Sequence, residues 1–164
     1  EQKSTPGKRV LLFVVVAALA LISDLLTKAW VFSRWQLGDQ EVLIEGWLYI
    51  TLILNPGVAF GGFPGGATVL LYGLPVLLLL ILAYAWKMRH EGAAVVFLMG
   101  CIFGGALGNY YDRLTVGQVR DFVDVRFGDW YDYPVFNLAD AYISCSVAGL
   151  LLLQLLHSRK RPVD

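Results

Sequence analysis

The stretch GAAVVFLMGCIFGGALGNYYDR, from Gly92 to Arg113, decides the fold class of this chain. Its first twenty residues, Gly92 to Tyr111, include no Asp, Glu, Lys or Arg. A charge-free stretch of at least about 18 residues is long enough to cross the hydrocarbon core of a bilayer as a helix. The sequence therefore predicts a membrane helix over about 93–111, with polar residues gathered at its second end.

The rest of the chain has the same character. Of its 164 residues, 57% are hydrophobic and 16% are charged, whereas soluble domains carry about 25% charged residues. Further apolar segments predict spans at about 10–32, 68–86 and 138–157. The first span follows basic residues, as a signal peptide does, but its apolar pattern continues to Phe32 and more spans follow, so we expect it to be retained. The expected fold is a four-helix integral membrane protein with a single domain over 1–164.

The basic residues predict how the chain crosses the membrane. The two ends and the turn at about 87–91 are rich in Lys and Arg, whereas the loops at about 33–67 and 112–137 carry fewer per residue. By the positive-inside rule, both termini are cytoplasmic and the two long loops lie outside. Within the first of these loops, 41–54 is rich in β-branched and aromatic residues and predicts one or two strands with a turn near Gly46.

Polar side chains gather at the predicted outer ends of the spans. Such groups are costly at membrane depth and raise a functional hypothesis. Two ion pairs are expected to be structural, Asp24 with Lys28 and Asp112 with Arg113. The gathered residues are Asp24, Lys28, Asn109, Asp112, Arg113, Asp121, Asp124, Asn137 and Asp140. Three loop acids are expected to be solvated, namely Asp124, Asp129 and Asp132.

Glycines at Gly100, Gly104 and Gly108 form a stripe of four-residue spacing on the third span. Such a stripe lets a neighbouring helix approach closely. The fourth span is a candidate neighbour, because its outer end holds Asp140.

Two aspartates held within a few Å of each other can share a proton, so that one acts as a base and the other as an acid. Such a pair can activate a water and protonate a carbonyl, which is peptide hydrolysis. The available carboxylates are Asp112, Asp121, Asp124 and Asp140, and spacing alone does not choose among them. For Asp140 the alternative is a helix cap.

Other chemistries fit the sequence less well. His90 and His157 both lie at cytoplasmic ends and give no zinc spacing, and the zero net charge gives no sign of nucleic-acid binding. Two rival functions remain, a small transporter or channel subunit and a structural scaffold. A transporter places polar groups near the membrane midplane and usually shows repeated halves, and this chain shows neither.

Five blocks of the sequence together resemble the lipoprotein signal peptidase (signal peptidase II) family, over nearly the whole chain. The blocks are SDLLTKAW (Ser23 to Trp30), NPGVAFG (Asn55 to Gly61), GGALGNYYDR (Gly104 to Arg113), VRDFVDV (Val119 to Val125) and VFNLADAYI (Val135 to Ile143). The resemblance implies four membrane helices with a small extracytoplasmic β-cradle. It also implies an aspartic endopeptidase of the bacterial inner membrane, which cuts diacylglyceryl-modified prolipoproteins on the amino side of the lipidated cysteine.

The resemblance also implies roles for individual residues. The catalytic pair carries over onto Asp121 and Asp140, and no metal or other cofactor is implied. The polar support carries over onto Asp24, Asn55, Gly57, Asn109, Asp112, Arg113 and Asn137. Arg120 departs from the family, which more usually has an apolar residue there, and we expect it to point outward, towards lipid headgroups. We further expect a monomer in contact with membrane lipids, whose 33–67 loop moves over the substrate on glycine hinges.

Overall fold

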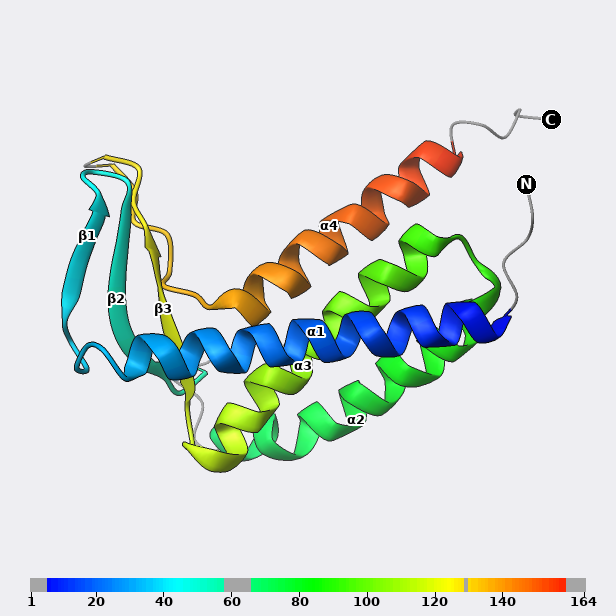
Figure 1. Cartoon of the computed structure of the whole chain (residues 1–164), viewed down its shortest axis with the longest axis horizontal. Coiled ribbons are helices and arrows are strands. Elements are labelled where there is room, and N and C mark those ends of the chain that lie inside the picture. The colour runs from blue at the N-terminus through cyan, green and yellow to red at the C-terminus, as the bar shows by residue number, and fades with distance from the viewer. Residues whose placement is uncertain (1–5, 58–65, 129, 159–164) are drawn as a thin grey trace.

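Four long helices and a small sheet make up the computed structural model of the chain, which describes residues 6–57, 66–128 and 130–158. Each of the four helices is long and apolar enough to cross a membrane, which confirms the predicted spans. The sheet lies at one end of the helices, and both termini lie at the other end (Figure 1). The elements in chain order are α1 (Pro6–Phe32), β1 (Gln40–Ile44), β2 (Leu48–Asn55), α2 (Gly66–Lys87), η2 (Met88–His90), α3 (Ala93–Thr115), β3 (Val119–Val125) and α4 (Leu138–Ser158).

The sheet joins the two long loops. β1 and β2 form an antiparallel hairpin whose turn contains Gly46, at φ +78°, as the sequence predicted. β3 comes from the second loop and pairs antiparallel with β2, so that Ile53 faces Asp121 across the ladder. The sheet order is therefore β1-β2-β3. This pairing places the end of β2 beside the residues that precede α4.

The glycine stripe of α3 packs against α1. A Cβ added at Gly104 would lie 2.8 Å from Cβ of Ala20, which is too close for a side chain. The predicted contact of the stripe with the fourth span is therefore wrong. Gly105 makes that contact instead, since a Cβ there would lie 2.7 Å from the carbonyl oxygen of Ala139. One residue along a helix turns the side chain by about 100°, so adjacent glycines serve different neighbours.

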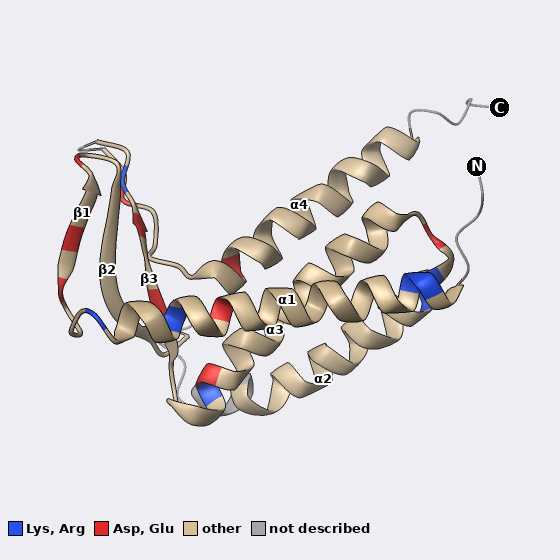
Figure 2. Cartoon of the chain, in the orientation of Figure 1, with Lys and Arg blue, Asp and Glu red and all other residues tan. Residues whose placement is uncertain are grey.

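α3 is the central helix, in contact with α1, α2 and α4. A core of Phe13, Val96, Met99 and Ile102 fills the space between the helices. The outward faces are apolar, with Leu151 of α4 57% exposed, as expected of side chains that contact lipid. Charged residues gather at the two ends of the helices and are rare along the length between them (Figure 2).

Candidate active site

Asp140 lies in the first turn of α4 and forms a reciprocal cap with Asn137. The backbone N–H of Asp140 donates to Oδ1 of Asn137 at 3.0 Å, and Oδ2 of Asp140 accepts the backbone N–H of Asn137 at 3.2 Å. The cap satisfies two N–H groups that the start of a helix leaves unpaired. It uses only one carboxylate oxygen. The other, Oδ1, accepts a 2.7 Å hydrogen bond from Nδ2 of Asn109 on α3, so Asp140 is both a cap and part of a wider network.

Asp121 reaches the same network from β3 and is completely buried. Its Oδ1 accepts a hydrogen bond from Nδ2 of Asn137 at 2.6 Å, and its Oδ2 accepts one from Nδ2 of Asn55 at 2.9 Å. Burial, which disfavours the charged form, raises the pKa of Asp121 from 3.8 to about 6. The negative charge of Asp140 also raises this pKa, whereas the hydrogen bonds from the two asparagines lower it. Asp121 therefore exchanges its proton near neutral pH.

The side chain of Asn137 joins the carboxylate of Asp121 to the backbone of Asp140. Its amide nitrogen donates to Asp121 and, at 3.0 Å, to Oδ1 of Asn109, while its oxygen accepts from the backbone of Asp140. The amide nitrogen of Asn109 in turn donates to Asp140. Neutral amides from α3 and the start of α4 thus fix both carboxylates in place.

A group of buried charges lies behind the amides. Nζ of Lys28 donates to Oδ2 of Asp24 at 2.8 Å and to Oδ1 of Asn109 at 3.0 Å, and it lies 3.2 Å from Oδ2 of Asp112. The predicted pairing of Asp24 with Lys28 is confirmed, and both side chains are fully buried. Oδ1 of Asp24 also accepts the backbone N–H of Ala139 at 3.0 Å. α1 therefore holds both the amide network and the start of α4.

Two predictions about arginines are wrong. Asp112 pairs with Arg120, whose Nη2 lies 2.6 Å from Oδ1, and not with Arg113. Neighbouring residues of a strand face opposite ways, so the side chain of Arg120 points away from Asp121. The end of α3 lies on that side, and its buried carboxylate, Asp112, needs a cationic partner. Arg120 is thus not directed to lipid headgroups. Arg113 instead donates from Nη1 to the backbone carbonyl of Asn109 at 3.0 Å.

Asp124 is a buried carboxylate of a different group, so its prediction as a solvated acid is wrong. It is 3% exposed, accepts a 2.6 Å hydrogen bond from Thr51, and pairs with Arg126 at 2.7 Å. Burial alone would raise the pKa of Asp124, but the hydrogen bonds from Arg126 and Thr51 together lower it. Asp132 is exposed as predicted, and Asp129 lies outside the described residues.

The sequence named four carboxylates as candidates for the catalytic pair, and ion pairing divides them into two groups. Asp112 and Asp124 each pair with an arginine. Within the described residues, no Lys or Arg forms an ion pair with Asp121 or Asp140. Asp121 and Asp140 are instead held by neutral amides and backbone N–H groups.

Asn55 owes its orientation to Gly57. The backbone N–H of Gly57 donates to Oδ1 of Asn55 at 2.8 Å, which leaves Nδ2 to face Asp121. Gly57 has φ +87°, in the region that favours glycine. The remainder of the NPGVAFG block, from residue 58 onward, lies outside the described residues, as does much of the loop segment predicted to act as a hinge.

All nine residues expected at the site therefore belong to the hydrogen-bond and ion-pair network around Asp121 and Asp140, or contact one of its members. Lys28 is an additional member, which the sequence placed in the polar cluster and paired with Asp24 but did not count among the site residues. The sequence could have predicted this role, because a lysine within an apolar membrane span is costly unless several polar groups surround its charge.

The arrangement resembles known proteins in sequence and in structure. The family described as Signal peptidase (SPase) II matches residues 16–156. The lipoprotein signal peptidase of Syntrophus aciditrophicus is 40% identical over 151 residues, covering 88% of this chain and 92% of the relative. The lipoprotein signal peptidase of Syntrophomonas wolfei is 38% identical over 142 residues, covering 87% and 91%.

A solved structure gives the same result for the fold. A bacterial membrane enzyme, determined by the in meso method at 1.9 Å resolution, superposes with a TM-score of 0.75 at 29% identity, covering 91% of this chain and 93% of its own. The match with the family extends from α1 to α4 and includes every residue of the network described above. The chain therefore belongs to the signal peptidase II family of aspartic peptidases.

Proposed function

We propose that this enzyme removes the signal peptide from diacylglyceryl-modified prolipoproteins, cutting on the amino side of the lipidated cysteine, and that Asp121 and Asp140 are its catalytic pair. The observation that carries the proposal is the difference among the carboxylates. Asp121 and Asp140 come from different elements, share one amide partner, and alone among the four candidates lack a paired arginine in the described residues.

The two aspartates take different parts in the reaction. Asp140 is half-buried and can reach a water molecule, so we assign it the role of the base that removes a proton while the water attacks the scissile carbonyl. Asp121, whose pKa is raised to about 6, holds the proton that passes to the carbonyl oxygen. When the tetrahedral intermediate collapses, the proton taken up by Asp140 passes to the departing amine, and one hydroxyl of the intermediate returns a proton to Asp121, which leaves a carboxylic acid and restores both aspartates. Water exclusion by a bound substrate strengthens proton retention at the buried aspartate.

The location of the pair suits a lipidated substrate. The pair lies where the helices meet the sheet, and the opposite end carries the basic residues predicted to face the cytoplasm (Figure 2). Acyl chains on the substrate cysteine would stay in the bilayer while the scissile bond lies at the outer interface. We therefore propose both termini in the cytoplasm, the site at the outer face of the bacterial inner membrane, and a single peptidase domain over 1–164 that acts as a monomer.

A gel-shift cleavage assay tests the proposal. Purified enzyme in detergent meets a prolipoprotein with and without diacylglycerol on its cysteine, in parallel with Asp121→Asn and Asp140→Asn. Asp132→Asn is the matched control, because Asp132 is an exposed carboxylate outside the network. We expect cleavage of the lipidated form only, lost in both pair variants and kept in the control. A folded enzyme that cut neither form would contradict the proposed substrate, and cleavage by one pair variant would contradict the assigned pair.

A further inference from the structure

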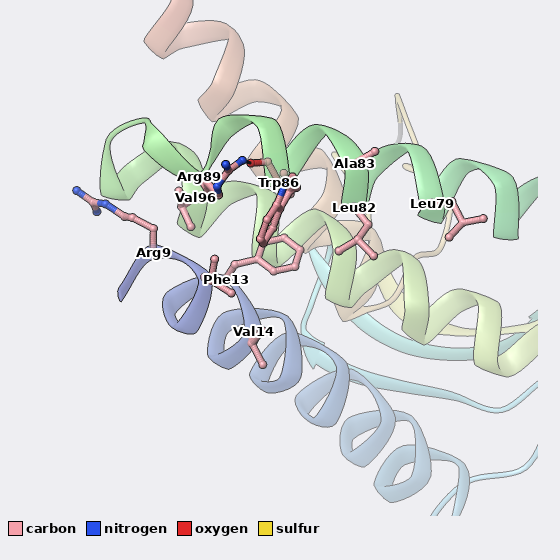
Figure 3. Close-up of a pocket in the computed structure, with 11 residues that line it drawn as sticks. Arg9, Phe13, Val14, Leu79, Leu82, Ala83, Trp86, Arg89 and Val96 are labelled. Carbon is pink, nitrogen blue, oxygen red and sulfur yellow. Dashed lines mark hydrogen bonds between the residues drawn. The ribbon is translucent and has the colours of Figure 1, made fainter. Parts of the chain in front are cut away.

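A cavity of about 570 Å³ lies between α1 and α2, at the end of the helices opposite the sheet (Figure 3). This volume falls within the range of about 300–1,000 Å³ that small-molecule sites occupy. The cavity is remote from the aspartate network, since its lining on α1 ends at Val14, ten residues before Asp24. The proposed reaction therefore does not use it.

The walls of the cavity are apolar. Phe13 and Val96, which belong to the helix core, form its floor, and Leu79, Leu82 and Trp86 of α2 form one side. On α2 the lining extends over the eight residues from Leu79 to Trp86, whose seven steps of about 1.5 Å correspond to about 10 Å. A groove of this length and composition accommodates a section of an acyl chain whose remainder continues into the bilayer.

Two arginines, Arg9 of α1 and Arg89 of η2, are the charged residues that line the cavity. The Arg89 guanidinium lies 4.4 Å from the centre of the Trp86 ring, and Nη1 donates to the Trp86 carbonyl at 2.6 Å. This contact fixes the guanidinium and uses one of its five N–H groups. Within the described residues, neither arginine forms an ion pair with a carboxylate. A held guanidinium suits a phosphate group, which it can bind through two parallel hydrogen bonds.

We propose that this groove binds an anionic glycerophospholipid, with the phosphate between Arg9 and Arg89 and part of one acyl chain along the apolar wall. The charges at the mouth select an acidic headgroup, and the apolar wall selects a lipid over free phosphate. Trp86 lies at the depth where aromatic side chains mark the membrane interface. A lipid held there contacts both α1 and α2 and stabilises the folded chain by mass action.

Native mass spectrometry of the full chain, titrated in detergent with dioleoylphosphatidylglycerol, tests the site. Dioleoylphosphatidylcholine and inorganic phosphate are the comparison ligands. Because the double variant Arg9→Gln/Arg89→Gln removes the charge-assisted hydrogen bonds to phosphate, we expect it to weaken phosphatidylglycerol binding at least about tenfold. The control Lys8→Gln/Lys87→Gln removes the same charge from exposed residues that do not line the cavity, and we expect a change below about twofold.

A second pair of variants tests the apolar wall. Ala83→Phe places a ring in the groove, whereas Leu80→Phe alters an exposed residue of the same helix that does not line it. We expect only Ala83→Phe to reduce lipid retention and the rise in melting temperature that phosphatidylglycerol produces. Should the glutamine variant not fold, Arg9→Lys/Arg89→Lys keeps the charge but not the paired geometry, and we expect it to bind several-fold more weakly.

Four results would overturn the proposal. Equal binding of phosphatidylcholine and phosphatidylglycerol would show that the headgroup is not recognised. Equal losses in the arginine and lysine variants would show a diffuse effect of charge. Binding of inorganic phosphate as tight as that of the lipid, or full retention of lipid by Ala83→Phe, would show that the groove contributes nothing.

Discussion

Replacing Asp121 by Asn removes a buried charge, and the raised pKa of this residue predicts how stability will respond. The shift from 3.8 to about 6 corresponds to about 3 kcal/mol, at 1.36 kcal/mol per unit. Since the folded-state pKa is the higher one, ionisation of Asp121 destabilises the folded enzyme as pH rises from about 4 to about 6. Below that range both states are protonated and the penalty is absent.

The substitution also has a structural cost. The carboxylate of Asp121 accepts hydrogen bonds from the NH₂ groups of Asn55 and Asn137. An asparagine in its place has one acceptor oxygen and one NH₂ group, so one of the two donors would face another donor and its hydrogen bond would be lost. Losing one such bond costs about 1 kcal/mol. We therefore expect Asp121→Asn to be more stable than the wild-type enzyme by about 2 kcal/mol at pH 8 and less stable by about 1 kcal/mol near pH 4.

Reversible unfolding in mixed micelles, monitored by tryptophan fluorescence at pH 4 and pH 8, measures both values. Asp124→Asn is the control of opposite sign, because the pKa of Asp124 is lowered. Its carboxylate stabilises the fold above the unfolded-state pKa, so this variant should lose stability at pH 8, and the loss should shrink as pH falls towards 4 and below. A stability difference for Asp121→Asn that does not change with pH would refute the reasoning, even if cleavage were abolished.

Three further substitutions test the packing and the polar network. Gly108→Ala places a methyl group against the buried carboxylate of α1 and should destabilise the fold by about 1–3 kcal/mol in thermal unfolding. Arg120→Leu leaves Asp112 with one cation in place of two and should destabilise by about 3 kcal/mol, measured in the same assay. Asn137→Ala removes the side-chain hydrogen bonds to the Asp121 carboxylate and the Asp140 backbone N–H, so for the proposed pair it should lower kcat in the cleavage assay by at least about 100-fold with little change in KM.

The first two substitutions have control variants, and the third is tested by how kcat and KM divide the effect. Gly73→Ala adds a methyl group that meets nothing within 4 Å, so it should leave stability unchanged or raise it slightly. Asp112→Asn combined with Arg120→Leu should recover part of the loss, and full additivity of the two changes would contradict the ion-pair account. A rise in KM with unchanged kcat in Asn137→Ala would indicate a role in substrate binding rather than in positioning the carboxylates.

The sequence alone was sufficient for the helices and for the hairpin. A long segment without charged residues predicts a membrane helix directly, and α3 and α4 begin at the residues that the sequence predicted. The pairing of β3 with β2 was not predictable in this way, because register between distant strands depends on tertiary contacts. The same reason applies to Arg120. The sequence correctly predicted that its side chain points away from Asp121, but its partner Asp112 on α3 could be identified only from the packing of β3 against α3.

The site residues show a similar division. The position of polar residues at the ends of predicted membrane spans identified the polar cluster. It could not show which carboxylates form ion pairs and which do not. Asp112, Asp121 and Asp124 look alike in the sequence, and only the arginines that contact two of them separate their chemistry. The glycine stripe likewise predicted close packing without its partner, since Ala20 on α1 and Ala139 on α4 face neighbouring glycines of one helix.

The network draws on α1, β2, α3, β3 and the first turn of α4, and this distribution bears on when the network assembles during synthesis. Asn137, Ala139 and Asp140 are its last members to leave the ribosome, and the backbone of Ala139 bonds to Asp24, a residue made 115 positions earlier. Chains grow from the N-terminus at about 5–20 residues per second. We therefore expect a nascent or truncated chain that lacks α4 to hold Asp121 without its proposed partner Asp140 and to have no peptidase activity. On this proposal, proteolytic competence arrives only when the final helix has inserted, and unfinished copies would not cut other proteins in the membrane.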